Sequence, residues 1–97
     1  MTATLSEPAT LALLPPVTVA YGPRRAVCGI RVYLALRCLT RAADRVTFGD
    51  LIRAVWGAGA VIRRDTVKAL THRCNQVLAR VGCPLRAAVE GDEAFLI

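Results

Sequence analysis

The spacing of apolar and polar residues changes several times along this chain, and each change marks an expected element. Residues 17–21 alternate and are rich in β-branched side chains, which predicts a strand. Gly22-Pro23 follows as a turn, and residues 25–27 are expected to return as a second short strand. From Gly29 to about Ala42 the apolar residues recur every three or four positions, which predicts a first helix.

Two further helices are expected downstream. Thr47 and Asp50 form a capping-box pattern in front of an apolar stripe, so a second helix is expected to begin there and to end at Trp56-Gly57. A third helix is expected from about Asp65, as its N-terminal cap, to Val81. On a helical wheel, the apolar side of this helix comprises Val67, Leu70, Cys74, Val77, Leu78 and Val81.

The chain ends with two short runs, 85–89 and 94–97, separated by the polar turn 90–93, which predicts a β-hairpin. The expected order is therefore a short strand or hairpin, three helices and a final hairpin. This mainly α architecture with a small β component is the order of a winged helix-turn-helix domain, with the last hairpin as the wing. We expect the domain to span residues 17–97.

Residues 1–16 are interpreted as a flexible leader in front of that domain. The segment is mildly apolar, lacks the basic start of a signal peptide, and contains three prolines. No apolar run anywhere in the chain reaches the roughly 18 residues of a membrane-spanning helix, so no membrane partner is expected.

The charge is distributed unevenly. Residues 24–86 carry all thirteen Lys and Arg against three Asp, a net charge of +10, whereas residues 87–97 carry −3. Twelve of the thirteen cations are Arg, and an Arg-rich basic segment favours phosphate-bearing partners. The alternative interpretation is a solvated basic surface with no ligand.

The cysteines and the remaining polar residues suggest no catalytic chemistry. The four cysteines form no C-x-x-C pair and are interpreted as small buried hydrophobes. The alternative, a metal site of His72, Cys74 and Cys83, lacks a fourth ligand at suitable spacing. Because paired carboxylates, a nucleophile elbow and a phosphate-cradling loop are absent from the sequence, we expect no enzyme, no cofactor and no small-molecule substrate.

A family resemblance lies between Arg45 and Gly57, which read R-V-T-F-G-D-L-I-R-A-V-W-G. This phrase resembles the second helix of the OmpR/PhoB-type DNA-binding effector domain of bacterial response regulators, where a phrase such as R-V-V-S-R-E-E-L-L-E-A-V-W-G occurs. Seven residues later, Asp65-Thr66-Val67 is similar to the family's recognition-helix start. The resemblance covers roughly residues 17–97, and this chain has no receiver domain of that family.

The resemblance implies a sequence-specific regulator of transcription in the bacterial cytoplasm that binds double-stranded DNA. Its third helix would enter the major groove and its wing the minor groove. Carried over by position, the residues facing DNA are Lys68, Thr71, His72, Asn75 and Gln76, with Arg73 on phosphate. Arg63 and Arg64 join this set because cations at a helix N-terminus oppose the helix dipole, so a phosphate contact explains them better than local stability does.

Three positions depart from the family pattern: Arg31 replaces an early acidic residue, the late recognition helix reads Asn75-Gln76-Val77, and the hairpin turn is acidic. The last departure matters most, because phosphate repels carboxylates. The alternative function is therefore a winged-helix protein–protein interaction module, an adaptor or a homodimer, with little or no DNA binding.

Overall fold

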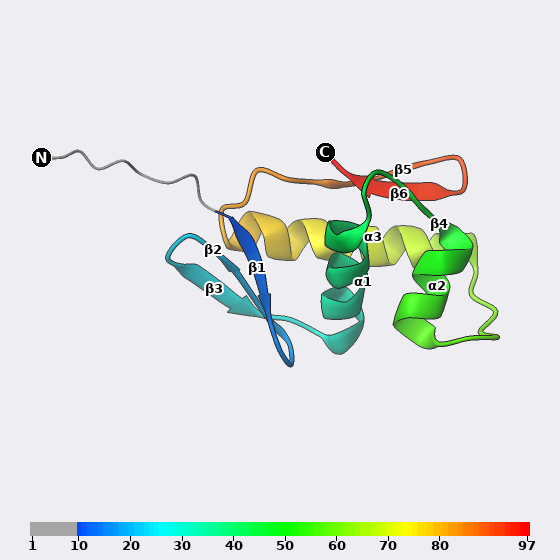
Figure 1. Cartoon of the computed structure of the whole chain (residues 1–97), viewed down its shortest axis with the longest axis horizontal. Helices are drawn as coiled ribbons and strands as arrows, with labels where there is room; N and C mark the ends of the chain where they lie inside the picture. The colour runs from blue at the N-terminus through cyan, green and yellow to red at the C-terminus, as the bar shows by residue number, and fades with distance from the viewer. Residues whose placement is uncertain (1–9) are drawn as a thin grey trace, which may run out of the picture.

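The computed structural model describes residues 10–97 of the protein. The described part contains three helices and two small antiparallel sheets (Figure 1). In chain order the elements are β1 (Leu11–Leu14), β2 (Thr18–Tyr21), β3 (Arg24–Val27), α1 (Ile30–Arg41), β4 (Val46–Thr47), α2 (Phe48–Trp56), α3 (Arg64–Arg80), β5 (Ala87–Glu90) and β6 (Glu93–Leu96). The expected sequence of short strands, three helices and a closing hairpin is present.

The first sheet has the strand order β1-β2-β3, and both neighbouring pairs are antiparallel. Strands β2 and β3 match the predicted hairpin, but β1 was not expected. The interpretation of residues 1–16 as a flexible leader is therefore wrong for 11–14, while 1–9 lie outside the described residues. Strand β1 escaped prediction because its sequence, Leu-Ala-Leu-Leu, has no apolar–polar alternation.

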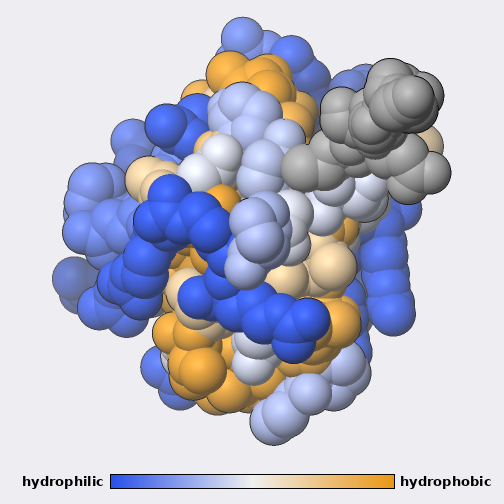
Figure 2. Space-filling view, turned by 90° about the vertical axis from the view of Figure 1, so that its left-hand side faces the viewer, coloured by the Kyte–Doolittle hydropathy of each residue, from blue (hydrophilic) through white to orange (hydrophobic). Residues whose placement is uncertain are grey.

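One end of this sheet leaves apolar side chains in solvent. Val27, the last residue of β3, is 69% exposed, and Ile30, at the start of α1, is 53% exposed. Figure 2 views the molecule from the side of this sheet and shows apolar residues gathered at the lower end, below a band of hydrophilic residues.

Helix α2 begins as predicted. The backbone N–H of Asp50 donates to the Thr47 hydroxyl oxygen at 3.1 Å, which is the first half of the capping box. The Asp50 carboxylate does not complete the box but lies 3.7 Å from the Arg53 guanidinium, one turn along the helix. After Trp56 the chain leaves the helix at Gly57, whose φ of 100° favours glycine.

Helix α3 begins one residue earlier than expected. Its N-cap is Arg63, which makes no side-chain capping bond, so the prediction of Asp65 as the cap is wrong. Asp65 lies in the first turn, where a carboxylate still interacts favourably with the positive end of the helix dipole. The helix ends at Arg80, close to the predicted end.

The second sheet has the strand order β4-β6-β5. Strands β5 and β6 form the predicted hairpin, closed by a two-residue turn, Gly91-Asp92, beyond the Glu90–Glu93 pair. Strand β4 was not predicted, because two residues carry no periodicity and their partner, β6, lies near the other end of the chain. Through β4, the hairpin is joined to the start of α2, where the Phe48 N–H donates to the Asp92 carbonyl oxygen at 2.8 Å.

A single apolar core lies among the three helices and the two sheets. Its fully buried members include Leu36 of α1, Leu51 of α2, Leu78 of α3 and Val19 of β2. Helix α1 contacts both α2 and α3, and α3 also packs on β5, so the core holds α3 by one side only. None of the helices between residues 10 and 97 has the length and apolar character needed to cross a membrane.

Candidate nucleic-acid interface

Helix α3 divides into a buried side and an exposed side, as its sequence predicted. The buried residues are Val67, Leu70, Thr71, Cys74, Val77 and Leu78. The exposed residues include most of the predicted DNA-facing set: Arg63 at the cap, then Lys68, His72, Arg73 and Gln76. Four of them project from the exposed side of α3 and Arg63 lies at its N-terminal end, which makes this part of the molecule a candidate surface for an extended ligand.

Thr71 is not part of that surface. It is only 7% exposed, and its hydroxyl donates to the Lys68 carbonyl oxygen at 2.7 Å, one turn back along α3. The prediction that Thr71 faces DNA is therefore wrong. On the helical wheel Thr71 lies at the edge of the apolar stripe, and in the folded protein this edge is also buried against the core.

Asn75 is bound to the protein itself. Its side-chain amide donates to the Ala87 carbonyl oxygen at 3.0 Å, and its oxygen accepts from the Ala87 N–H at 2.7 Å. Both hydrogen-bonding ends of the amide therefore hold the first residue of β5. Asn75 was predicted to read a base; because its amide holds β5, its orientation is fixed by the protein, and we expect Gln76 to contribute more to base recognition.

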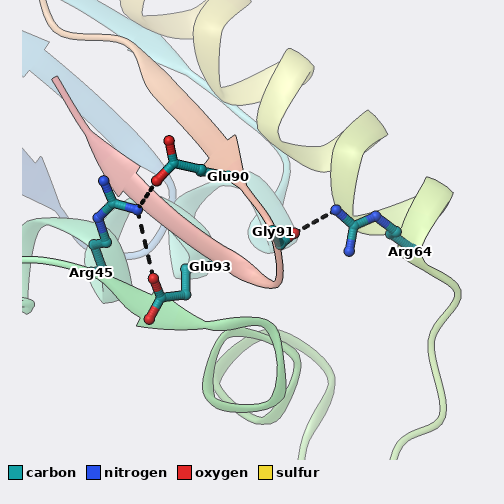
Figure 3. Close-up of polar contacts among 5 residues, drawn as sticks. All are labelled: Arg45, Arg64, Glu90, Gly91 and Glu93. Atoms are coloured by element: carbon teal, nitrogen blue, oxygen red, sulfur yellow. Dashed lines mark hydrogen bonds and ion pairs between the residues drawn. The ribbon is translucent and has the colours of Figure 1, made fainter.

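Arg64 is also engaged within the molecule. Its guanidinium donates to the Gly91 carbonyl oxygen (Figure 3) and to the Asp92 carboxylate. It also lies 5.1 Å from the centre of the Phe48 ring. The residue was predicted to contact phosphate, but here it joins the start of α3 to the turn of the β5–β6 hairpin. The Asp92 carboxylate offsets the unfavourable interaction between the Arg64 cation and the positive end of the helix dipole. An arginine at this position therefore has a local explanation that needs no phosphate.

The same hairpin contains a second internal ion pair. The Arg45 guanidinium lies 2.5 Å from the Glu90 carboxylate and 3.6 Å from that of Glu93 (Figure 3). It also stacks 4.2 Å from the centre of the Phe95 ring. The hydrogen bond to Glu90 raises the pKa of the Arg45 guanidinium. Each acidic side chain of the turn therefore has an arginine partner from within the molecule, and the three carboxylates with two guanidiniums leave a net charge of −1 in place of −3.

Arg45 was missed by sequence reasoning because the residues of its ion pairs are more than 40 positions apart. Arg31 was also missed as a candidate. Its guanidinium lies 5.6 Å from the centre of the Trp56 ring, and it lines a groove of about 310 Å³ together with Arg73 and Asp65 of α3. Arg31 thus adds a cation beside α3, at the position where the family has an acid.

The cysteines lie apart from this surface. Cys74 and Cys83 are buried, whereas His72 is exposed, so the structure does not bring together the three residues of the alternative metal site. Within residues 10–97, no group of three or more His, Cys, Asp or Glu side chains is arranged to hold a metal ion. Burial raises the pKa of the Cys74 thiol to about 12, with a smaller contribution from Cys28.

Comparisons with known proteins add no relative from which a site could be transferred. No protein-family model matches the chain, and no curated protein matches it. The candidate surface therefore depends on its own geometry: one exposed helix side with Arg63, Lys68, His72, Arg73 and Gln76, and Arg31 next to it.

Proposed function

We propose that the protein is a double-stranded DNA-binding regulator of transcription with a winged helix-turn-helix architecture. In this proposal α2 and α3 form the helix-turn-helix, α3 enters the major groove, and the β5–β6 hairpin is the wing. The element order and the one-sided burial of α3 support it, because a recognition helix must be anchored on one side and free on the other. The protein then acts in the bacterial cytoplasm.

The observation that carries the proposal is the set of unpaired cations around α3. Among the described residues, Arg31, Arg63, Lys68 and Arg73 belong to no ion pair, and the only acidic residue of α3 is Asp65. Cations that are not used for internal pairing are available to neutralise phosphates, and phosphate neutralisation supplies most of the affinity of non-specific DNA binding.

Base recognition is assigned to His72 and Gln76. Both lie on the exposed side of α3, between the phosphate-directed cations, and the Gln76 amide has the donor and acceptor that match adenine. With Thr71 and Asn75 engaged internally, this leaves two base-reading side chains. A low specificity ratio between a preferred site and random duplex is therefore expected.

The acidic hairpin opposes this function only weakly. Its carboxylates are paired with Arg45 and Arg64, so the repulsion between the turn and phosphate is much weaker than the sequence suggested. The turn contributes no free cation, however, and we expect the wing to lie near the duplex without adding to the salt dependence of binding.

The test is a salt titration of binding to random duplex. Neutralising three or four phosphates predicts a log–log slope of roughly −3 to −4, since each contributes about −0.9. Lys68→Ala and Arg73→Ala should each lower the magnitude of the slope by about one and weaken binding to all sequences equally. The matched control is Arg41→Ala, an exposed arginine on α1 away from this surface.

Gln76→Ala should change the preference among sequences while leaving the salt slope unchanged. Absence of binding at low salt, or affinity that salt does not alter, would contradict DNA binding by this protein.

A further inference from the structure

We infer that the free edge of β1 and the groove beside it form a docking site for an extended, acidic segment of a partner protein. This site is made of residues of β1 and α1 and shares none with the proposed DNA surface. Its two components are an unpaired strand edge and two unpaired arginines of α1.

Strand β1 is an edge strand that carries no charge. Among residues 10–97, the sheet order β1-β2-β3 leaves one side of β1 unpaired, and its sequence is Leu11-Ala12-Leu13-Leu14. The opposite edge, β3, carries Arg24 and Arg25. Charged residues on an edge strand prevent pairing with other chains. The β3 edge is therefore protected against strand addition by its two arginines, whereas the β1 edge has no such charge.

A groove of about 310 Å³ follows the free side of β1. Its lining comprises Leu11, Leu13, Pro15, Tyr33, Arg37, Thr40 and Arg41. No residue of β2 lines it, which places the groove on the side of β1 that faces α1, and Figure 1 shows β1 as the strand of this sheet nearest to α1. An added strand would therefore lie with β1 on one side and the exposed surface of α1 on the other.

The charge of this groove defines the partner. Arg37 and Arg41 are exposed one turn apart on α1, a helix with no acidic residue, and neither belongs to an ion pair among residues 10–97. Like charges at this spacing repel each other, so an anionic ligand is favoured between them. Arg37 and Arg41 also line the groove on the other flank of α1, which contains Asp44 and Asp50, but neither carboxylate forms an ion pair with them.

The free strand edge and the two neighbouring arginines together favour an extended peptide over other anions. The main-chain N–H and C=O groups of a free edge pair with another strand, and alternate side chains of that strand point to the same face. Carboxylates on the face toward α1 would reach Arg37 and Arg41, while the alternate apolar side chains would lie on the other face, beside Ala12 and Leu14. A second copy of this chain fits less well, because its own β1 carries no acid to neutralise these arginines.

The probe is a fluorescein-labelled octapeptide of alternating Val and Glu, with the Val–Lys octapeptide as its charge-reversed control. We expect the Val–Glu peptide to bind the full chain with an affinity that falls as salt rises, and the Val–Lys peptide not to bind. Arg37→Glu/Arg41→Glu should weaken binding at least ten-fold. The matched variant Arg24→Glu/Arg25→Glu, on the opposite edge of the sheet, should stay within two-fold of the unmodified protein.

Amide hydrogen exchange separates strand addition from simple charge attraction. On addition of the Val–Glu peptide, alternate amides within residues 11–14 should exchange more slowly, because their N–H groups gain strand partners. Three results would overturn the inference: no binding, equal loss in both double variants, or binding without protection of β1. If Arg37→Glu/Arg41→Glu weakened binding to duplex DNA, these arginines would be assigned to nucleic acid instead. If the protein formed a dimer in which β1 is protected without peptide, the edge would be assigned to a second copy.

Discussion

The two sides of α3 use the same kinds of polar residue for different purposes. On the side facing the protein, Arg64 pairs with Asp92 and Asn75 holds the backbone of Ala87. On the side facing solvent, Lys68 and Gln76 make no described hydrogen bond or ion pair. Asn75 and Gln76 are neighbours in sequence and similar in chemistry, yet one anchors the helix and the other is free to bind. Substitutions on the first side should therefore change stability, and those on the second should change binding.

The largest expected effect concerns the buried thiol of Cys74, whose pKa burial raises to about 12 from an ordinary value of 9.0. In the unfolded chain this thiol ionises as the pH rises through 9, whereas in the folded chain it stays neutral. The stabilisation is thus complete below pH 9 and is lost toward pH 12, at about 1.4 kcal/mol per pH unit. Urea unfolding at pH 9 and 11 should therefore show a loss of roughly 2–3 kcal/mol from this group.

The matched variant is Cys74→Ala, which removes the thiol and keeps the site apolar. It should be less stable than the unmodified protein at pH 7 because of the cavity, but its stability should fall less steeply between pH 9 and 11. Cys28 and Cys38 remain in both proteins and have pKa values shifted in the same direction by burial, so only the difference in slope reports Cys74. Identical slopes would show that Cys74 is not shielded from water.

The next effect is that of Asn75→Ala. The substitution removes two hydrogen bonds and leaves the N–H and C=O of Ala87 without their partner, which should cost about 2 kcal/mol in urea unfolding. Gln76→Ala is the matched control on the exposed side and should change the stability by less than about 0.5 kcal/mol. If the two alanine variants were equally stable, the division of α3 into an anchoring and a free side would be wrong.

A smaller effect is expected for Arg64→Ala. The ion pair with Asp92 is exposed, so the loss of this pair and of the Phe48 contact should together cost about 1 kcal/mol. Arg63→Ala, one residue earlier and without such contacts, should be neutral for stability. The Arg64 effect should shrink in 1 M salt, which screens exposed pairs; an effect that salt leaves unchanged would indicate packing alone.

The smallest effect on folding is predicted for the free cations. Lys68→Ala and Arg73→Ala should each alter the free energy of unfolding by less than about 0.5 kcal/mol. A larger destabilisation by either variant would mean that its side chain has a structural role, and its effect on DNA binding would then have to be measured against that loss.

Local patterns predicted much of the fold but little of the candidate surface. The Thr47 cap, the end of α2 and the apolar side of α3 all followed from spacing and residue type. Strands β1 and β4 did not, because the first lacks alternation and the second depends on a partner strand almost 50 residues away. Among the eight residues expected to face DNA, Arg64 and Asn75 are held by the β5–β6 hairpin and Thr71 is buried, whereas Lys68, His72 and Gln76 lie on the exposed side of α3.

The sequence by itself determined which side of each helix is apolar, where α2 is capped, and that the middle of the chain is basic and its end acidic. These properties depend on residues within one or two turns of each other. Only the tertiary structure decided which charges are neutralised. The ion pairs of Arg45 and Arg64 join residues 45 and 28 positions apart, and the Asn75 amide meets β5 only after the hairpin folds against α3. Pairing at such separations depends on how the elements pack, and no local pattern of charge specifies it.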